Sequence, residues 1–247
     1  MHPDHRNFFD KEGVAYGAIY STHTTHGYLM SHSRELVAGL LAREKGGALL
    51  DIGCGAGTFI PVARSAGFTY LGVDQSPSMV EGCRQLIGAA NDARVVVGNA
   101  VSLPVEDSSF DAVLALGVFE YLDHSQRAEA FDQLVRAVKP GGLVIGSFSN
   151  YYSPYRTWYR WRGVARTPES LRFHEFKLAD VRKLLEARGM SIVQTVPLGI
   201  HPFPPPIAER LPRLAANCTY YLRGRVGRAF GVMAMANLVV ARRIERA

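Results

Sequence analysis

Residues 48–59 read ALLDIGCGAGTF, an apolar run that ends in an aspartate and a turn with three glycines. The run predicts a buried strand, and the glycines predict a tight turn into a helix. Such a turn presents backbone N–H groups at the carboxyl end of an α/β sheet, where ligands bind. A dinucleotide site would favour GxGxxG, whereas the spacing here is Asp51-x-Gly53-x-Gly55-x-Gly57.

Two carboxylates narrow the choice of ligand. Asp51 would face the ligand as a fixed negative charge, which repels phosphate and suits a cationic amine. Asp74 ends the apolar stretch FTYLGVD, 21 residues after Gly53, where a carboxylate accepts hydrogen bonds from both ribose hydroxyls. Asp74 alone fits NAD or S-adenosylmethionine, but together the two acids favour S-adenosylmethionine, which carries an ammonium, a sulfonium and an adenosine.

Outward from this turn, apolar stretches of strand length alternate with amphipathic stretches, which predicts an α/β fold with a mostly parallel sheet covered on both faces. Ser33 and Ser76 are the expected helix caps, and Phe131, Leu134, Val135 and Val138 form one helical stripe. The predicted strands are 48–53, 68–74, 93–99, 110–122, 142–150, 191–199 and 235–243, and the predicted helices include 31–43, 76–87, 177–189 and one near 207–222.

The length of 247 residues and the 47% hydrophobic content predict one domain with one substantial core. Three cysteines without metal-like spacing give no disulfide framework and indicate a reducing, cytoplasmic setting. The N-terminal residues lack the pattern of a secretory signal, and the longest late apolar run, 229–241, is too short to span a bilayer. The histidines near the N-terminus match no tight metal site, so we expect no metal.

Charge is divided unevenly along the chain. Residues 1–150 hold 11 Lys and Arg against 16 Asp and Glu, whereas residues 151–247 hold 17 against 6. This gives net charges of −5 and +11. The basic part is either a solvated surface or the binding side for an anionic partner, namely an acidic substrate, a membrane surface or nucleic acid.

Four blocks in order resemble the class I S-adenosylmethionine-dependent methyltransferases, in the methyltransferase-domain group that includes quinone- and biotin-pathway enzymes. The blocks are LLDIGCGAGTF, LGVDQSPSMV, VVVGNAVSLPVEDSSFDAVLALGVFEYL and LVRAVKPGGLVIGSFSN, and they cover roughly residues 48–150. The resemblance implies a Rossmann-like, doubly wound, seven-stranded sheet whose last strand, within 235–243, is antiparallel. We expect residues 1–45 to form an N-terminal lid and helix, 46–150 the cofactor-binding core, and 151–173 and 201–230 insertions that cap the substrate.

The resemblance also assigns the cofactor contacts. The acid and glycines of the turn would hold the methionine and ribose end, Asp74 the ribose hydroxyls, and Met79 the adenine or simply the core. Asn99 stands where the family usually has aspartate, and its amide oxygen can still accept from the adenine amino group, with weaker recognition. The complete set of expected cofactor-binding residues is Asp51, Gly53, Gly55, Gly57, Asp74, Gln75, Met79, Asn99, Ala100, Leu116 and Gly117.

Methyl transfer from a sulfonium is an in-line displacement in which the protein mainly aligns the partners. An oxygen acceptor also needs a base, whereas an electron-rich carbon needs less help. The candidate catalytic residues are His174, which follows the aromatic insertion, Tyr16, in a segment that related enzymes fold over the pocket, and Tyr121. The family often has histidine at position 121, so Tyr121 is either a base or a pocket wall.

Residues 151–162 interleave tyrosines and tryptophans with arginines. At helical spacing, one face holds Tyr155, Trp158 and Trp161 or Arg162. Beside an ordinary packed lid helix, three interpretations fit: a wall for an acidic or apolar-aromatic acceptor, a peripheral membrane contact, or a platform for single-stranded RNA. RNA ranks last because the basic residues form no compact run.

The sequence therefore predicts a methyltransferase that uses S-adenosylmethionine on a small organic acceptor, most simply at oxygen. The alternatives are a non-catalytic S-adenosylmethionine-binding module and a C-methyltransferase that acts on a quinone-like or lipid-like acceptor at the membrane surface. A nicotinamide oxidoreductase is disfavoured because Asp51 opposes pyrophosphate.

Overall fold

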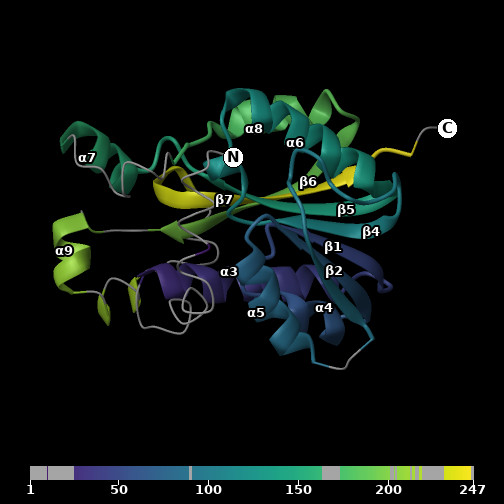
Figure 1. Ribbon diagram of the computed structural model, residues 1–247. Helices are drawn as coiled ribbons and strands as arrows, with labels where there is room; N and C mark the ends of the chain where they lie inside the picture. The colour runs from purple at the N-terminus through teal and green to yellow at the C-terminus, as the bar shows by residue number, and fades with distance from the viewer. Residues whose placement is uncertain are drawn as a thin grey trace.

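The computed structural model describes residues 10, 25–88, 91–162, 173–200, 203, 205–211, 213–214, 217–218 and 231–245. Within them, a seven-stranded sheet lies between two layers of helices (Figure 1). The strands are β1 (Gly47–Ile52), β2 (Phe68–Asp74), β3 (Ala93–Val97), β4 (Phe110–Ala115), β5 (Val138–Ser149), β6 (Met190–Ile200) and β7 (Ala234–Arg243).

The strand order is β3-β2-β1-β4-β5-β7-β6. The pairs among β1 to β5 are parallel, and β7 is antiparallel to both of its neighbours, β5 and β6. The predicted doubly wound sheet with an antiparallel last strand is thus confirmed. The order reverses between β1 and β4, and in open α/β sheets ligands bind at such a switch point, outside the carboxyl ends of the strands.

Helices cover both faces of the sheet, with α3, α4 and α5 on one side and α6 and α8 on the other (Figure 1). One apolar cluster joins the sheet to the first group of helices and a second joins it to the other group. The helices are α3 (Thr25–Leu41), α4 (Ile60–Ser65), α5 (Pro77–Ile87), α6 (His124–Ala137), α7 (Pro154–Arg162), α8 (Leu178–Glu186) and α9 (Pro205–Arg210), with short 3₁₀ turns η1 (Phe119–Tyr121) and η2 (Gly231–Met233).

Several local predictions are confirmed. The strand over 68–74 has the predicted bounds, and α5 begins at Pro77 with Ser76 as its cap, because the Ser76 hydroxyl accepts the Met79 N–H. The helix near 207–222 begins two residues early, at Pro205, and most of the remaining span lies outside the described residues.

Three local predictions are wrong. Ser33 does not cap its helix, because α3 begins at Thr25 and the Ser33 hydroxyl donates to the Leu29 carbonyl one turn back. The strand expected over 110–122 ends at Ala115, since Gly117 adopts a left-handed φ of 69° and a 3₁₀ turn follows. Val138 is the first residue of β5 rather than part of the helical stripe.

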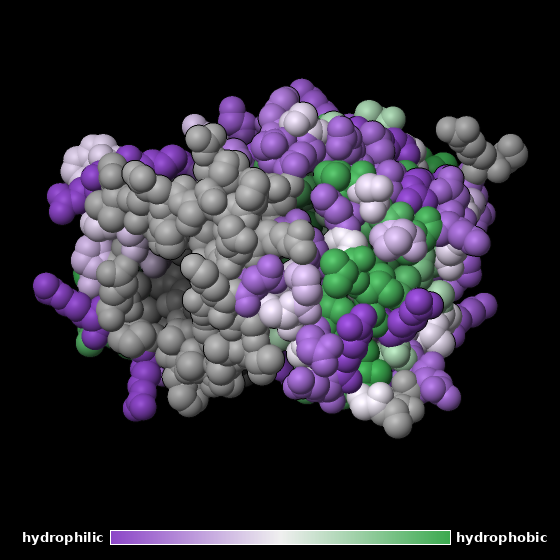
Figure 2. All heavy atoms as spheres, in the orientation of Figure 1, coloured by the Kyte–Doolittle hydropathy of each residue, from purple (hydrophilic) through white to green (hydrophobic). Residues whose placement is uncertain are grey.

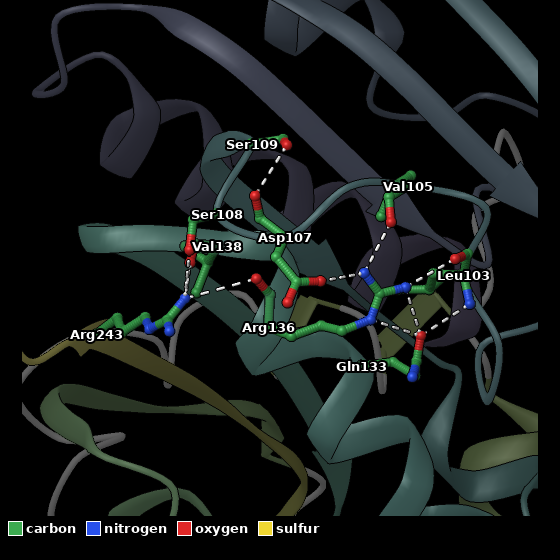
Figure 3. Close-up of polar contacts among 9 residues, drawn as sticks. All are labelled: Leu103, Val105, Asp107, Ser108, Ser109, Gln133, Arg136, Val138 and Arg243. Carbon is green, nitrogen blue, oxygen red and sulfur yellow. Dashed lines mark hydrogen bonds and ion pairs between the residues drawn. The ribbon is translucent and has the colours of Figure 1, made fainter.

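Arg136, in the last turn of α6, holds the crossover that leads from β3 to β4 (Figure 3). Its guanidinium donates to the carbonyls of Leu103 and Val105 and forms an ion pair with Asp107 at 2.7 Å. Gln133, one turn earlier on α6, accepts the Leu103 N–H at 3.0 Å. These contacts fix a loop whose first residues are candidate cofactor contacts.

No helix among the described residues is long and apolar enough to cross a membrane.

Candidate functional site

The glycine turn follows β1 at the switch point of the sheet. Gly53, Gly55 and Gly57 all adopt left-handed φ angles, of 69°, 51° and 76°. At Gly53 a β-carbon would lie 2.5 Å from a methyl of Val118, so only glycine fits there. At Gly55, by contrast, a β-carbon would meet no atom of the described residues within 4 Å, so the described part of the chain leaves space beside this part of the turn. The turn therefore offers exposed backbone beside a space that a ligand can fill.

Asp51 lies beneath this turn and is only 2% exposed. Its carboxyl group accepts a 2.6 Å hydrogen bond from the hydroxyl of Tyr70 on β2. Burial raises the pKa of Asp51 to about 7, against the opposing effect of the Tyr70 hydrogen bond and with a further increase from Asp74. The sequence suggested a fixed negative charge here, whereas in the structure the charge depends on pH near neutrality.

Asp74 ends β2 on the other side of the turn. One carboxylate oxygen accepts the Gly55 N–H and the other the Ser76 N–H, each at 2.9 Å. Burial raises the pKa of Asp74, and these N–H groups oppose the increase. Asp74 therefore ties the glycine turn to the start of α5, and each oxygen keeps lone-pair capacity for a ribose hydroxyl.

Asp10 also reaches the start of α5, although its neighbours in sequence lie outside the described residues. Its carboxylate accepts from the Ser76 hydroxyl at 2.5 Å, and its backbone carbonyl accepts from the Ser78 hydroxyl at 3.0 Å. Its charge adds to the rise in the pKa of Asp74. An N-terminal residue thus lies at the rim of the candidate cofactor site.

The candidate adenine contacts lie at the ends of β2 and β3. Met79 is 3% exposed in the first turn of α5, so most of its side chain is packed inside the protein. The amide oxygen of Asn99 accepts the Val101 N–H at 3.2 Å, which leaves one lone pair for an adenine amino group. Gln75 and Ala100, next to Asp74 and Asn99 in the chain, are half-buried.

Leu116 and Gly117 follow the end of β4. The Gly117 N–H donates to the hydroxyl of Ser147 on β5 at 2.8 Å, so the backbone group that Gly117 can offer a ligand is its carbonyl. Among the described residues, no atom would lie within 4 Å of a β-carbon at Gly117. The described part of the chain therefore also leaves space beyond the end of β4.

These residues fit S-adenosylmethionine. The described residues leave space beside Gly55 and Gly117, a carboxylate lies at the end of β2, and an ionisable carboxyl group lies under the turn. Asp74 and Asn99 would hold the sugar and the base, and Asp51 would balance the ammonium group.

A second polar cluster lies beside the first, at the ends of β4 and β5. Glu120 is 4% exposed, and one of its oxygens accepts the Ser149 hydroxyl at 3.0 Å. Arg156 of α7 is 5% exposed and donates to the same hydroxyl at 3.1 Å. The other oxygen of Glu120, Oε2, is buried and has no hydrogen-bond partner among the residues that the structure describes. Burial raises the pKa of Glu120, and the Ser149 hydrogen bond and the charge of Arg156 oppose the increase.

Strand geometry places Glu120 near the end of β4. Ser147 and Ser149 are two residues apart on β5, so their side chains point to the same face of the sheet. Ser147 binds Gly117 and Ser149 binds Glu120, so the Glu120 carboxyl group lies about 7 Å further along that face. This position is beside the expected methyl end of the cofactor.

The structure brings two of the three candidate catalytic residues to this cluster. The His174 backbone N–H donates to the Glu120 carbonyl at 2.8 Å. The Tyr121 ring packs edge-on against Phe173 at 5.6 Å, and the Arg156 guanidinium lies over the same Phe173 ring at 4.6 Å. Tyr16 lies outside the described residues.

Glu120 and Asp10 are the residues that the sequence analysis missed. Glu120 carried a signal, because it is the only acid in the apolar stretch VLALGVFEYL and lies inside the strand predicted over 110–122. Buried acids are rare unless paired or functional. Asp10 gave no such signal, since its partners Ser76 and Ser78 lie 66 and 68 residues away in the sequence.

The comparisons with known proteins agree with this geometry. Residues 50–146 match the family of methyltransferase domains. A tRNA (carboxymethyluridine(34)-5-O)-methyltransferase from Arabidopsis thaliana is 32% identical over 112 residues, which are 45% of this chain and 26% of that protein. Norajmaline N-methyltransferase from Rauvolfia serpentina is 32% identical over 149 residues, 58% of this chain and 46% of that protein. The chain thus spans less than half the length of these two relatives.

Among solved structures, a chain of the complex between the Haloferax volcanii Trm112 methyltransferase activator and a methyltransferase has the same fold. The TM-score is 0.65 at 22% identity, over 96% of this chain and 98% of that one. Residues 50–146 therefore belong to the methyltransferase-domain family, and the protein carries a class I S-adenosylmethionine-dependent methyltransferase domain. Its cofactor is S-adenosylmethionine.

Proposed function

We propose that the whole chain is a methyltransferase that moves the methyl group of S-adenosylmethionine to a hydroxyl oxygen of a small organic acceptor. The observation that carries this proposal is Oε2 of Glu120, which is buried near the end of β4 and has no hydrogen-bond partner in the described part of the chain. A buried acceptor without a donor is costly, and an acceptor hydroxyl that reaches Oε2 would satisfy it.

When bound, S-adenosylmethionine supplies an electrophilic methyl group on a sulfonium leaving group. The Glu120 carboxylate would take the hydroxyl proton at Oε2 as the acceptor oxygen bonds to the methyl carbon. The Ser149 hydroxyl donates to the other oxygen and itself accepts from Arg156, so the carboxylate cannot rotate without breaking the Ser149 hydrogen bond. The raised pKa of Glu120 makes it a stronger base than an exposed glutamate.

Tyr121 and Phe173 would form an aromatic wall of the acceptor site, next to the Arg156 guanidinium. This combination suits an acceptor with a ring. The relatives support methyl transfer but cover several acceptors, since one is named for an oxygen and another for a nitrogen. The proposal that residues 151–173 and 201–230 cap the substrate rests on where α7 and α9 leave the sheet.

The test begins with S-adenosylmethionine labelled in its methyl group, incubated with the protein and a panel of phenols, catechols and hydroxy acids. Mass spectrometry and NMR of the product identify the accepting atom. A methyl group bound to oxygen supports the proposal, and one bound to carbon or nitrogen contradicts it. The protein is also incubated with cell extracts. If neither the extracts nor the panel yield a methylated product, the protein is better described as a non-catalytic module that binds S-adenosylmethionine.

The role of Glu120 is tested with Glu120→Gln, which keeps its shape but cannot take a proton. We expect kcat to fall about 100-fold or more, while S-adenosylhomocysteine binding, measured by calorimetry, stays unchanged. Asp74→Ala, in contrast, removes an expected cofactor contact and should weaken S-adenosylhomocysteine binding at least tenfold. Glu81→Gln, at an exposed position on α5, is the matched control. Unchanged kcat in Glu120→Gln would exclude it as the base.

A further inference from the structure

Helix α7 reverses the usual pattern of a surface helix. Its one buried residue is Arg156, whose guanidinium donates to the Met235 carbonyl at 3.0 Å as well as to Ser149. Its aromatic side chains are half-buried or exposed instead, and Trp161 is 78% exposed. Packing alone does not explain this arrangement, because an apolar face would normally turn inward.

Other exposed apolar side chains belong to segments that lie at the same end of the sheet as α7. α7 follows the carboxyl end of β5, α9 follows the carboxyl end of β6, and η2 precedes β7, which runs antiparallel between those strands. Figure 1 shows α7 and α9 at the same end of the molecule. We call this set of exposed residues the edge patch: Tyr151, Tyr152, Trp161, Ile207, Leu211, Leu214 and Val232.

Basic side chains accompany the edge patch. Arg162 of α7 is exposed, as are Arg210 of α9 and Arg213 just beyond it. The Arg160 guanidinium lies over the Tyr151 ring at 4.5 Å. These residues belong to the part of the sequence that carries a net charge of +11. Figure 2 shows hydrophilic side chains projecting from this end of the molecule.

We propose that the edge patch binds the surface of an anionic lipid bilayer. Tryptophan and tyrosine favour the boundary between headgroups and acyl chains, leucine and isoleucine insert beside them, and arginine is drawn to anionic headgroups. An acidic protein would also attract the arginines, but seven apolar side chains spread over three separate segments suit a broad, fluid surface better. The inference does not depend on which atom is methylated.

The protein offers a direct probe, because its two tryptophans, Trp158 and Trp161, both lie in α7. The full chain is mixed with vesicles of phosphatidylcholine alone or with one third phosphatidylglycerol, and binding is followed by flotation and tryptophan emission. We expect at least tenfold tighter binding to the anionic vesicles, a blue shift of the emission, and weaker binding as salt is raised. Absence of binding to anionic vesicles, or equal binding to both kinds, overturns the proposal.

Variants locate the contact. Tyr152→Ser combined with Trp161→Ser should weaken vesicle binding at least fivefold, and Arg162→Gln with Arg213→Gln should remove most of the salt dependence. The controls are Leu86→Ser and Val193→Ser, which are 64% and 61% exposed and lie outside the edge patch. Unchanged S-adenosylhomocysteine affinity and circular dichroism verify that each variant is folded. If the controls lose binding as much as the patch variants, the contact lies elsewhere and the proposal fails.

Discussion

A single carboxyl group, that of Asp51, links burial to ligand binding. It is enclosed beneath the glycine turn, and its pKa of about 7 means that the free protein carries a mixture of charged and neutral forms at neutral pH. Only the charged form would balance the ammonium group of the cofactor in the proposed site. Binding would therefore depend on a titration that an exposed aspartate would have completed several pH units lower.

This dependence gives a prediction for calorimetry. With a pKa of about 7, Asp51 is about one-tenth ionised at pH 6 and nine-tenths at pH 8. We expect S-adenosylhomocysteine affinity to rise about tenfold over that interval, with proton release on binding. Asp51→Asn should bind weakly and without this slope. A flat profile in the wild type would show that Asp51 is not the group that balances the ammonium.

Folding stability should depend on pH in the opposite direction to ligand affinity, which provides a second check. Because the folded pKa of Asp51 lies above its ordinary value of 3.8, the native state binds this proton more tightly than the unfolded state. The stabilisation is complete below about pH 4 and is lost as the pH rises through 7. The melting temperature of the ligand-free protein should therefore fall as the pH rises from 4 to 8, and it should fall more than the melting temperature of Asp51→Asn does over the same interval.

Among the elements, α6 does more than cover the sheet, because Arg136 and Gln133 fasten the crossover between β3 and β4. Arg136→Met keeps much of the aliphatic volume but leaves two carbonyls without their donor. We expect a loss of about 2–3 kcal/mol in the free energy of unfolding, measured with urea.

The matched control is Arg84→Met, which removes an exposed arginine paired with Glu81 at 3.5 Å. It should change the free energy of unfolding by less than about 0.5 kcal/mol. Equal effects of the two substitutions would mean that the crossover is held by other contacts.

Elements were predictable from the sequence where one local cause decided them. Pro77 and Ser76 fix the start of α5, and alternating apolar residues fix the strand over 68–74. The extent of β4 was not predictable, because FDAVLALGVFEYL is apolar apart from Asp111 and Glu120, and the strand ends at Ala115, two residues before the left-handed backbone of Gly117. Ser33 was misleading because an N-cap and a mid-helix serine bonded to the preceding turn look alike in sequence.

In the candidate site, too, some residues were predictable from the sequence and others were not. The motif predicted the glycine turn, Asp51 and Asp74 because their spacing along the chain sets their positions. Glu120, Ser149 and Arg156 come from three separate elements, so their meeting depends on tertiary packing that no spacing records. Likewise, an aromatic-rich helix suggests buried rings and exposed arginines, whereas in α7 the buried residue is Arg156.

In the molecule as a whole, the sheet depends on β7, which pairs with β5 from Leu143 to Ser149 and with β6 from Met190 to Ile200. A chain that stops before Gly231 would leave both strands without their central partner. We expect it to show no cooperative thermal transition and no S-adenosylhomocysteine binding, whereas a chain that stops after Arg243 should keep both. Cooperative unfolding of the shorter chain would show that β7 is dispensable.

The placement of β7 also bears on biosynthesis. The ribosome makes β5 and β6 before β7, the strand that separates them in the sheet. Until β7 is made, β5 and β6 each have a long edge whose backbone N–H and C=O groups lack their native partner. Premature annealing of those edges to each other would trap a misfolded sheet. Production of this protein should therefore respond strongly to chaperone supply and to slower translation at low temperature.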